Sequence, residues 1–264
     1  MIIALLSATM TDTQSETTSF GFRDVPKTEK ASLVRGVFDR SARRYDLMND
    51  LMSLGIHRAW KDMTIERANP QPGEVLIDVA GGTGDLARAF VAKAEKRRKT
   101  RSGGPARAIV CDINEQMLLA GLKRGDAAHL DWAVGNAEFL PFEDNTADCV
   151  TIAFGIRNVT NRVTALKEMR RVLKPAGRFL CLEFSRPTTR ALERIYDAWS
   201  FNAIPVLGEA IAKDRDSYQY LVESIRRFPN QDAFADELRE AGFGQVSVTN
   251  YSGGIAALHT GWKI

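Results

Sequence analysis

A short apolar run that passes through three glycines into a helical pattern constrains the fold of this chain more than any other feature. The run ends at Val79, the glycines are Gly81, Gly82 and Gly84, and the helical pattern begins at Asp85. Glycines at a strand–helix junction allow a tight turn and let a ligand come close to the backbone. The sequence therefore predicts an α/β fold with a ligand site at this loop.

Apolar β-type runs alternate with helical patterns along most of the chain. We expect strands at 74–80, 107–113, 130–135, 148–154, 178–184, 245–250 and 255–262, and helices at 85–98, 114–123 and 161–173. Such alternation indicates βαβ crossovers. The predicted fold class is α/β, a three-layer sandwich with a mainly parallel seven-stranded sheet, in one domain over 31–264.

Four segments outside this alternation receive separate predictions. Residues 1–30 begin with a short apolar run and continue with a polar stretch, which predicts a disordered leader. The helical segments 37–70 and 188–228 are predicted to cover the carboxyl ends of the strands, where open α/β sheets bind ligands. The basic segment 93–105 is predicted to be a surface insertion. No apolar run approaches the roughly 20 residues that a membrane span needs.

Charge and cysteine content argue against several classes of function. The chain carries 36 Lys and Arg against 33 Asp and Glu, and a net charge of +3 does not indicate nucleic-acid binding. Cys111, Cys149 and Cys181 lie in separate apolar runs without the spacing of a metal site. We expect buried, reduced thiols, no metal, and a cytoplasmic location.

Two classes of ligand compete for the glycine loop. The spacing Gly82-x-Gly84-x-x-Ala87 satisfies the dinucleotide pattern, which places a pyrophosphate on the helix N-terminus. Asp78 at the end of the strand and Asp85 at the start of the helix would repel a diphosphate at close range. The same two carboxylates suit the ammonium and sulfonium groups of S-adenosylmethionine. Charge therefore favours the methyl donor over a nicotinamide dinucleotide.

Polar residues follow the next two strands as well. Asp112 ends the second strand, and an ionised carboxylate there can accept both hydroxyls of an adenosine ribose. Asn136 follows the third strand and can recognise adenine, with the apolar residues 140–142 packing beside it. The alternative role for Asn136 is that of a turn-capping residue. We favour the ligand because this loop lies at the same edge of the sheet as the other two.

A set of motifs spread over the chain is more specific than the glycine loop alone. The motifs are Ala-Gly-Gly-Thr-Gly-Asp (80–85), Asn-Ala-Glu-x-Leu-Pro-Phe (136–142), Ala-Phe-Gly-Ile-Arg-Asn-Val (153–159), Leu-Glu-Phe-Ser-Arg-Pro (182–187), and the segments 37–58, 201–208, 216–229 and 253–263. Together they resemble the ubiquinone/menaquinone biosynthesis C-methyltransferases of the UbiE type. The resemblance covers about residues 37–264.

The resemblance implies a class I, Rossmann-like methyltransferase fold and S-adenosyl-L-methionine as the cofactor. It implies methylation of a ring carbon of a polyprenyl benzoquinol, a demethylmenaquinol or both, in ubiquinone and menaquinone biosynthesis. The expected donor-binding residues are Asp78, Gly82, Thr83, Gly84, Asp112, Asn136, Ala137 and Ala153. The family commonly has Ser where this chain has Ala153, so a hydroxyl contact is absent there or is replaced by backbone.

Arg157 and Asn158 follow the fourth strand and are predicted to face the methyl group of the donor. Our hypothesis is that Arg157 stabilises the phenolate that develops on the quinol, while Asn158 and Tyr45 orient the ring. The alternative for Arg157 is a structural ion pair with an acidic residue of the following helix. Glu183, at the end of the fifth strand, is a weaker candidate for proton relay.

We assign no histidine as a general base. His129 lies in a predicted turn, and His57 and His259 are expected to be hydrogen-bonded structural residues. The apolar segment 191–212 is predicted to line a groove for the polyprenyl tail or to touch the bilayer; the alternative is a packed cover helix.

The expected partners are a polyprenyl quinol and, at the inner face of the membrane, a peripheral lipid contact. A homodimer and contacts with other quinone-biosynthesis enzymes stay open. Three rival functions also stay open: a methyltransferase for another small molecule, a nicotinamide-dependent reductase, and a non-catalytic protein that binds the donor.

Overall fold

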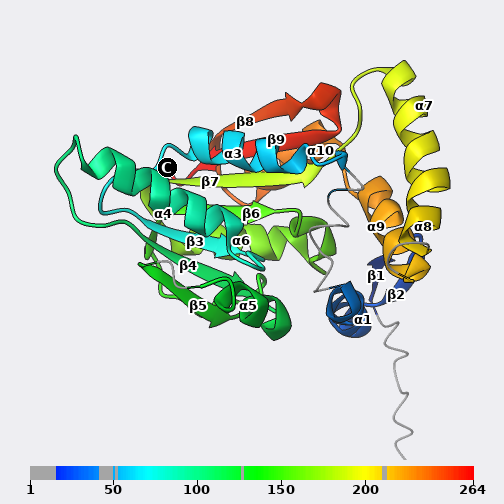
Figure 1. Ribbon diagram of the computed structural model, residues 1–264, viewed down its shortest axis with the longest axis horizontal. Helices are drawn as coiled ribbons and strands as arrows, with labels where there is room; N and C mark the ends of the chain where they lie inside the picture. Colours follow the sequence, from blue (N-terminus) through cyan, green and yellow to red (C-terminus); the bar gives the residue numbers. More distant parts are fainter. Residues whose placement is uncertain (1–15, 42–49, 51–52, 126–127, 210–212) are drawn as a thin grey trace, which may run out of the picture.

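A seven-stranded sheet with strand order β5-β4-β3-β6-β7-β9-β8 forms the centre of the molecule (Figure 1). The computed structural model describes residues 16–41, 50, 53–125, 128–209 and 213–264. The strands are β3 (Val75–Val79), β4 (Arg107–Asp112), β5 (Leu130–Val134), β6 (Ala147–Ala153), β7 (Leu173–Phe184), β8 (Gly244–Tyr251) and β9 (Ala256–Trp262). Neighbouring strands are parallel except that β9 runs antiparallel to β7 and β8. The predicted mainly parallel sheet is confirmed.

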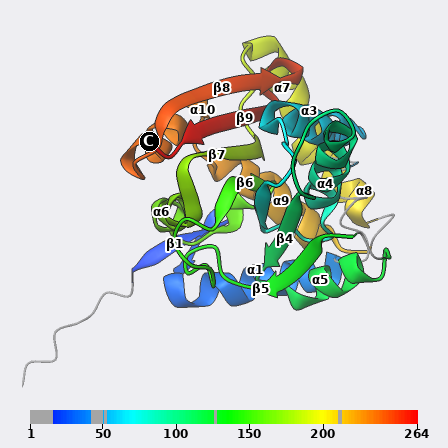
Figure 2. The same cartoon turned by 90° about the vertical axis from the view of Figure 1, so that its left-hand side faces the viewer.

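Helices cover both faces of this sheet. On one face lie α3 (His57–Ala68), α4 (Asp85–Arg98) and α5 (Glu115–Leu122), and on the other lie α6 (Arg162–Val172) and α10 (Gln231–Glu240) (Figure 2). Alternate side chains of β3 enter the two cores, since Leu76 packs with the first group of helices and Ile77 with the second. Each is fully buried, which stabilises the fold by about 1.5–3 kcal/mol per side chain.

One predicted helix boundary has a clear local cause, and one strand boundary differs from the prediction. Asn114 caps α5, because its side-chain oxygen accepts hydrogen bonds from the backbone N–H groups of Gln116 and Met117. Helix α6 ends at Val172 and the chain continues directly into β7 from Leu173. The sequence placed the start of this strand at 178, so the prediction was too late.

The N-terminal segment corrects the prediction of a disordered leader over residues 1–30. Strands β1 (Thr17–Phe20) and β2 (Arg23–Pro26) form an antiparallel hairpin, and α1 (Lys27–Ser41) follows at once. The prediction is wrong for residues 16–30, and residues 1–15 lie outside the described part of the chain. The physical reason is that Phe20 packs against Tyr220, a contact between distant residues that sequence periodicity does not reveal.

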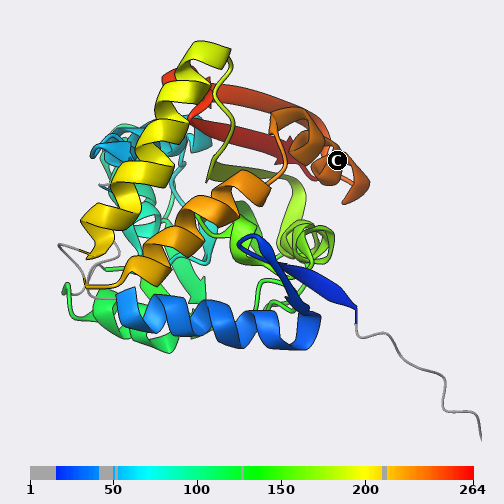
Figure 3. The same cartoon turned by 90° about the vertical axis from the view of Figure 1, so that its right-hand side faces the viewer.

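Four cover helices lie beyond the carboxyl ends of the parallel strands. They are α1, α7 (Arg190–Ala198), α8 (Ile204–Leu207) and α9 (Arg215–Arg227), and a π-helical turn at Trp199–Ala203 joins α7 to α8 (Figures 1 and 3). Helix α3, in contrast, packs against α4 and β7 on the face of the sheet. Residues 57–68 of the predicted cover 37–70 therefore belong to a helical layer of the sandwich and do not cover the strand ends.

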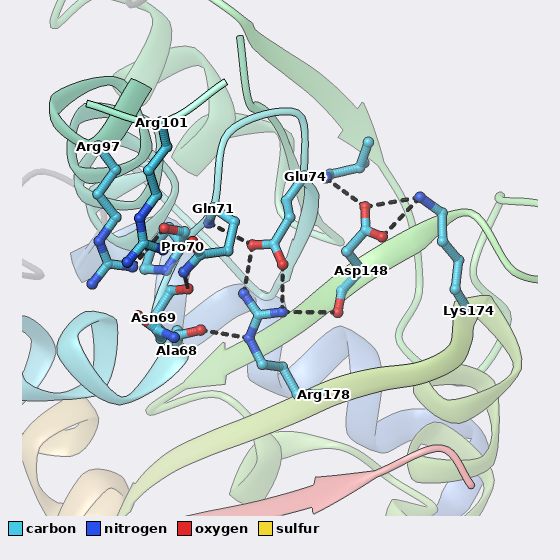
Figure 4. Close-up of polar contacts among 11 residues, drawn as sticks. Ala68, Asn69, Pro70, Gln71, Glu74, Arg97, Arg101, Asp148, Lys174 and Arg178 are labelled. Carbon is cyan, nitrogen blue, oxygen red and sulfur yellow. Dashed lines mark hydrogen bonds and ion pairs between the residues drawn. The ribbon is translucent and has the colours of Figure 1, made fainter. Parts of the chain in front are cut away.

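Polar contacts close the opposite edge of the sheet, at the amino ends of the strands (Figure 4). The Arg178 guanidinium donates to both oxygens of the Glu74 carboxylate, at 2.8 and 2.6 Å, and to the carbonyl oxygen of Ala68. The basic segment 93–105 contacts the same edge, where Arg97 in the last turn of α4 donates to the carbonyl of Pro70. These contacts anchor α3 and the basic segment away from the cavity described next.

Candidate functional site

One cavity lies at the carboxyl ends of the parallel strands. Its wall is formed by the loops that follow β3, β4, β5 and β6, and α1 adds Ala31, Val34 and Arg35 from the cover. The atom-free space in this hollow is about 1140 Å³ with its mouth included, enough for a nucleoside-sized ligand. The position agrees with the rule that open α/β sheets bind ligands at this edge.

The structure brings nearly all predicted donor-binding residues to this cavity. The residues that line it are Asp78, Gly82, Thr83, Asp112, Asn136, Ala137 and Ala153. Gly84 does not line the cavity; it precedes α4 with a φ of 79°, where a Cβ would lie 3.0 Å from the ring of Trp132. Gly84 therefore shapes the turn, and its predicted contact with the donor has no support in the geometry.

The glycine loop leaves no room for side chains at its first two glycines. A Cβ at Gly81 would lie 2.8 Å from the carbonyl oxygen of Asp78, and Gly82 has a φ of +55°. The Gly82 N–H donates to the Asp112 carboxylate at 2.9 Å, which links the first loop to the second. A ligand in the cavity can therefore approach bare backbone at this point.

Two buried carboxylates give the cavity its negative charge. Asp78 is only 1% exposed, and burial raises its pKa to about 7, although the hydroxyl of Thr151 donates to it at 2.6 Å. Burial also raises the pKa of Asp112 to about 6, against the effect of backbone N–H donors. Within the described chain neither carboxylate forms an ion pair, so a bound cation would relieve an electrostatic cost.

Asp85 does not have the role that the sequence gave it. Its two oxygens pair with Lys61 at 2.7 Å and with Arg124 at 2.6 Å. Its charge is therefore neutralised by the protein, and the prediction that Asp78 and Asp85 together attract a cation is wrong for Asp85. Asp112 replaces it as the second unpaired carboxylate of the cavity.

Asn136 has the turn-capping role considered for it and also lies in the cavity wall. Its side-chain oxygen accepts the backbone N–H of Glu138 at 3.0 Å, which is the turn-capping contact. The residue also lines the cavity beside Ala137. Across the cavity, the hydroxyl of Thr83 accepts a hydrogen bond from Arg124 at 2.9 Å.

Arg157 lies beneath the cavity wall and is absent from its lining. Its guanidinium donates to the Phe154 carbonyl at 2.5 Å and to the Glu183 carboxylate at 2.8 Å, and both charged side chains are 2% exposed or less. The structure therefore contradicts a direct contact between Arg157 and a phenolate. The alternative of a structural ion pair holds, but the partner is on β7 and not on the following helix. Glu183 is committed to the same pair.

Asn158 remains in the cavity wall, one residue further along the chain. Its side-chain oxygen accepts a hydrogen bond from the hydroxyl of Tyr220 at 2.9 Å, and its side-chain nitrogen is buried without a partner. Sequence reasoning missed Tyr220, although it lies within the motif 216–229. Tyr45, the third predicted catalytic residue, lies outside the described residues.

None of the three histidines lines this cavity. His57 contacts the Ser53 hydroxyl at 3.1 Å and His259 contacts the Gln231 carbonyl at 2.9 Å, as expected for structural residues. The three cysteines are buried in β4, β6 and β7, as predicted. Within the described residues, no group of His, Cys, Asp or Glu could hold a metal ion, and no helix is long and apolar enough to cross a bilayer.

Sequence comparison matches the chain to known proteins along most of its length. The model of the ubiE/COQ5 methyltransferase family matches residues 23–263. The ubiquinone/menaquinone biosynthesis C-methyltransferase UbiE of Caulobacter vibrioides is 59% identical over 246 residues, which cover 93% of this chain and 98% of the relative. The UbiE protein of Cereibacter sphaeroides is 55% identical over 259 residues, covering 97% of this chain and 100% of the relative.

Solved structures share the fold at low sequence identity. A SAM-dependent methyltransferase of Thermotoga maritima has a TM-score of 0.60 and 19% identity, covering 87% of this chain and 99% of that one. A phosphoethanolamine N-methyltransferase of Haemonchus contortus, solved in complex with S-adenosyl-L-methionine, has a TM-score of 0.54 and 16% identity, covering 78% and 52%. The expected class I, Rossmann-like fold is confirmed.

Proposed function

Because the chain belongs to the ubiE/COQ5 methyltransferase family, we propose that its cavity binds S-adenosylmethionine and that the enzyme methylates a ring carbon of a polyprenyl quinol. The chain is a SAM-dependent methyltransferase of ubiquinone and menaquinone biosynthesis. The acceptor in this proposal is a polyprenyl benzoquinol, a demethylmenaquinol or both. The observation that supports it most directly is the pair of buried, unpaired carboxylates beside the glycine loop.

The residues of the cavity fit the charge of this donor. S-adenosylmethionine supplies the methyl group on a positively charged sulfur. We propose that Asp78 faces a cationic group of the donor and that Asp112 accepts the ribose hydroxyls. Asn136 and Ala137 then contact the adenine, and the backbone at Gly82 and Thr83 lies against the chain of the donor. A dinucleotide would bring phosphate charges against the same carboxylates, which argues against a reductase.

The acceptor carbon becomes nucleophilic when a hydroxyl ortho or para to it loses its proton and moves charge into the ring. In our proposal Asn158 binds the oxygen that carries this charge, and Tyr45 keeps its predicted role of orienting the ring. Arg157 acts indirectly, because its pair with Glu183 fixes the turn at 156–158. Helix α1 forms one side of the cavity through Ala31, Val34 and Arg35.

Calorimetry and product analysis test this function together. The purified protein should bind S-adenosylmethionine and should convert a short-chain quinol into a product one methyl group heavier by mass spectrometry. Tight binding of NAD without detectable binding of the methyl donor would refute the proposal. Quinones extracted from cells that lack the protein should accumulate one methyl short, and the ring of that species identifies the acceptor as a benzoquinol or a naphthoquinol.

We also propose that the cover from α7 to α8 carries the polyprenyl tail and touches the membrane. Ile195 is 68% exposed and Val206 56%, while Phe201 stacks on Phe22 of the hairpin with ring centroids 6.3 Å apart. The exposed rings of Phe22 and Phe201 thus join two distant segments in one apolar contact. Tyr196 and Ile204 are buried, so the alternative of a packed cover helix accounts for part of the segment.

Co-sedimentation with anionic liposomes tests the membrane contact. The wild-type protein should sediment with the liposomes, and the double variant Phe22→Ser and Phe201→Ser should stay in the supernatant. Ile264→Ser is the control, because it removes an even more exposed apolar side chain at the far C-terminal end. A wild-type protein that binds no liposomes, either alone or with acceptor, contradicts this part of the proposal.

A further inference from the structure

The side-chain amide of Asn158 has a hydrogen-bond partner at its oxygen and none at its nitrogen. The Tyr220 hydroxyl lies 2.9 Å from the amide oxygen. The amide nitrogen is buried and has no hydrogen-bond partner in the described structure. A buried polar group without a partner costs free energy, about 1–3 kcal/mol, so it persists where function requires it. Asn158 belongs to the wall of the cavity, where a bound acceptor can supply the missing partner.

The chemistry of the phenol fixes the orientation of this amide. Tyr220 is buried, and burial raises the pKa of its hydroxyl, so the hydroxyl keeps its proton. No other hydrogen bond of this hydroxyl occurs in the described structure, and the proton must go to the amide oxygen of Asn158. The amide nitrogen, with its two N–H donors, then points away from Tyr220.

Packing from two elements immobilises the ring of Tyr220. The ring stacks on Phe20 of β1 with centroids 4.3 Å apart and an interplanar angle of 23°. Val34 and Val37 of α1 belong to the same buried cluster. The hairpin and α1 therefore fix Tyr220, and through it the direction in which the amide can donate.

The backbone of Asn158 is fixed independently of its side chain. The ion pair of Arg157 with Glu183 ties the 3-10 turn at Ile156–Asn158 to β7, and the Asn158 N–H donates to the Gly155 carbonyl at 3.0 Å. With the backbone fixed, the side chain keeps the two torsions about its Cα–Cβ and Cβ–Cγ bonds. The hydrogen bond from the Tyr220 hydroxyl restricts both.

We infer that Tyr220 is a positioning residue that turns the Asn158 amide so that its N–H group donates to the acceptor oxygen beside the carbon that receives the methyl group. This inference rests on the proposed function. The hydrogen bond strengthens as the oxygen becomes a phenolate, because hydrogen bonds to charged acceptors are stronger than those to neutral ones. Tyr220 therefore assists the methyl transfer without touching either substrate.

Tyr220→Phe tests this role, because it removes the hydroxyl and keeps the ring that packs against Phe20. We expect kcat to fall about tenfold, the effect of one hydrogen bond on a rate. The Kd of S-adenosylmethionine should change less than about twofold, since Tyr220 lies outside the cavity lining. Tyr251→Phe is the matched control, because its hydroxyl interacts with Thr64 on the other side of the molecule, and kcat should stay unchanged.

A double-mutant cycle separates positioning from general stability. In the Asn158→Ala background, Tyr220→Phe should cause no further loss of kcat. Asn158→Asp is a second test that leaves Tyr220 unchanged. The aspartate carboxylate still accepts the Tyr220 proton, but it has no N–H group to donate to the acceptor. It should be about as slow as Asn158→Ala.

Three results would overturn the inference. They are full kcat in a folded Tyr220→Phe enzyme, multiplicative losses in the double variant, and wild-type activity in Asn158→Asp. Each of these leaves the proposed function standing, because the wild-type enzyme still methylates the quinol. A wild-type enzyme that methylates no quinol would instead overturn the proposed function, and this inference with it.

Discussion

Thr151→Val is expected to move the pH at which the affinity for the methyl donor increases to a higher value. Thr151 is fully buried on β6, and its hydroxyl donates to the Asp78 carboxylate at 2.6 Å. Valine has nearly the same shape but cannot donate a hydrogen bond. The substitution therefore removes a contact that favours the ionised form of Asp78, with little change in packing.

The size of the effect follows from the strength of that hydrogen bond. A hydrogen bond to a charged group contributes about 1.5–3 kcal/mol, and one pKa unit corresponds to about 1.4 kcal/mol. The pKa of Asp78, already raised to about 7 by burial, should rise further by about one unit or more. At pH 7 the ionised fraction then falls from about one half to about one tenth, and the affinity for the donor falls about fivefold.

The sign of the pH dependence is fixed by which form of Asp78 binds a cation. The ionised form attracts it, so the affinity of the wild-type protein should increase as the pH rises through about 7. Titration calorimetry with S-adenosylmethionine from pH 6 to pH 9 measures this curve. Because both proteins bind the same donor, ionisation of the donor itself cancels in the comparison.

Thr260→Val is the matched control, since Thr260 is a buried threonine of β9 whose hydroxyl contacts Ser247, away from the cavity. Its curve should coincide with that of the wild-type protein. A Thr151→Val curve that also coincides with it would refute the reasoning that Asp78 meets the donor as an anion.

Three further predictions concern the glycine loop, the buried ion pair of Arg157 and Glu183, and the effect of Asp78 on stability. Gly81→Ala should lower the free energy of unfolding by about 1–3 kcal/mol and abolish donor binding, while Gly104→Ala, with open space around it, should change neither in thermal melts and calorimetry. Glu183→Gln should lower stability by about 3–5 kcal/mol, because it leaves Arg157 buried without its counter-charge; a melting temperature equal to wild type contradicts this. Burial raises the pKa of Asp78 from 3.8 to about 7, so the folded state holds an extra proton between these values and loses stability as the pH rises through them. Asp78→Asn should therefore melt several degrees higher than wild type at pH 8 while binding the donor poorly, and equal melting curves at pH 8 would count against it.

The sequence predicted which residues lie together beside the glycine loop because that part of the cavity is built from local signals. A strand end, a cluster of glycines and a carboxylate at the next strand end are each recognisable within a few residues, as at Asp78, Gly82 and Asp112. Parallel strands then bring their carboxyl ends to one edge, which the fold class alone implies. The residues expected to surround one ligand, except Gly84, therefore line one cavity.

The role of Asp85 and the acceptor side were predicted less well because the contacts there join residues that are far apart. Charge alone could not reveal that Asp85 is neutralised by Lys61 and Arg124, 24 and 39 residues away. The burial of Arg157 against Glu183 depends on the neighbouring positions of β6 and β7, and the sequence suggested an exposed arginine at the site. Tyr220 lay within a quoted motif, but nothing local indicated that its hydroxyl reaches Asn158.

The hydrogen bonds that join the β1–β2 hairpin to α9 affect how the protein folds. The Phe22 N–H donates to the Glu223 carboxylate across 201 positions of the chain, and Arg227 binds Asp24 across 203. Contacts of such high contact order form slowly, and during synthesis they must wait until α9 has emerged from the ribosome. We therefore expect the hairpin to dock on α9 late in folding, after strands β3 to β6 have emerged and paired.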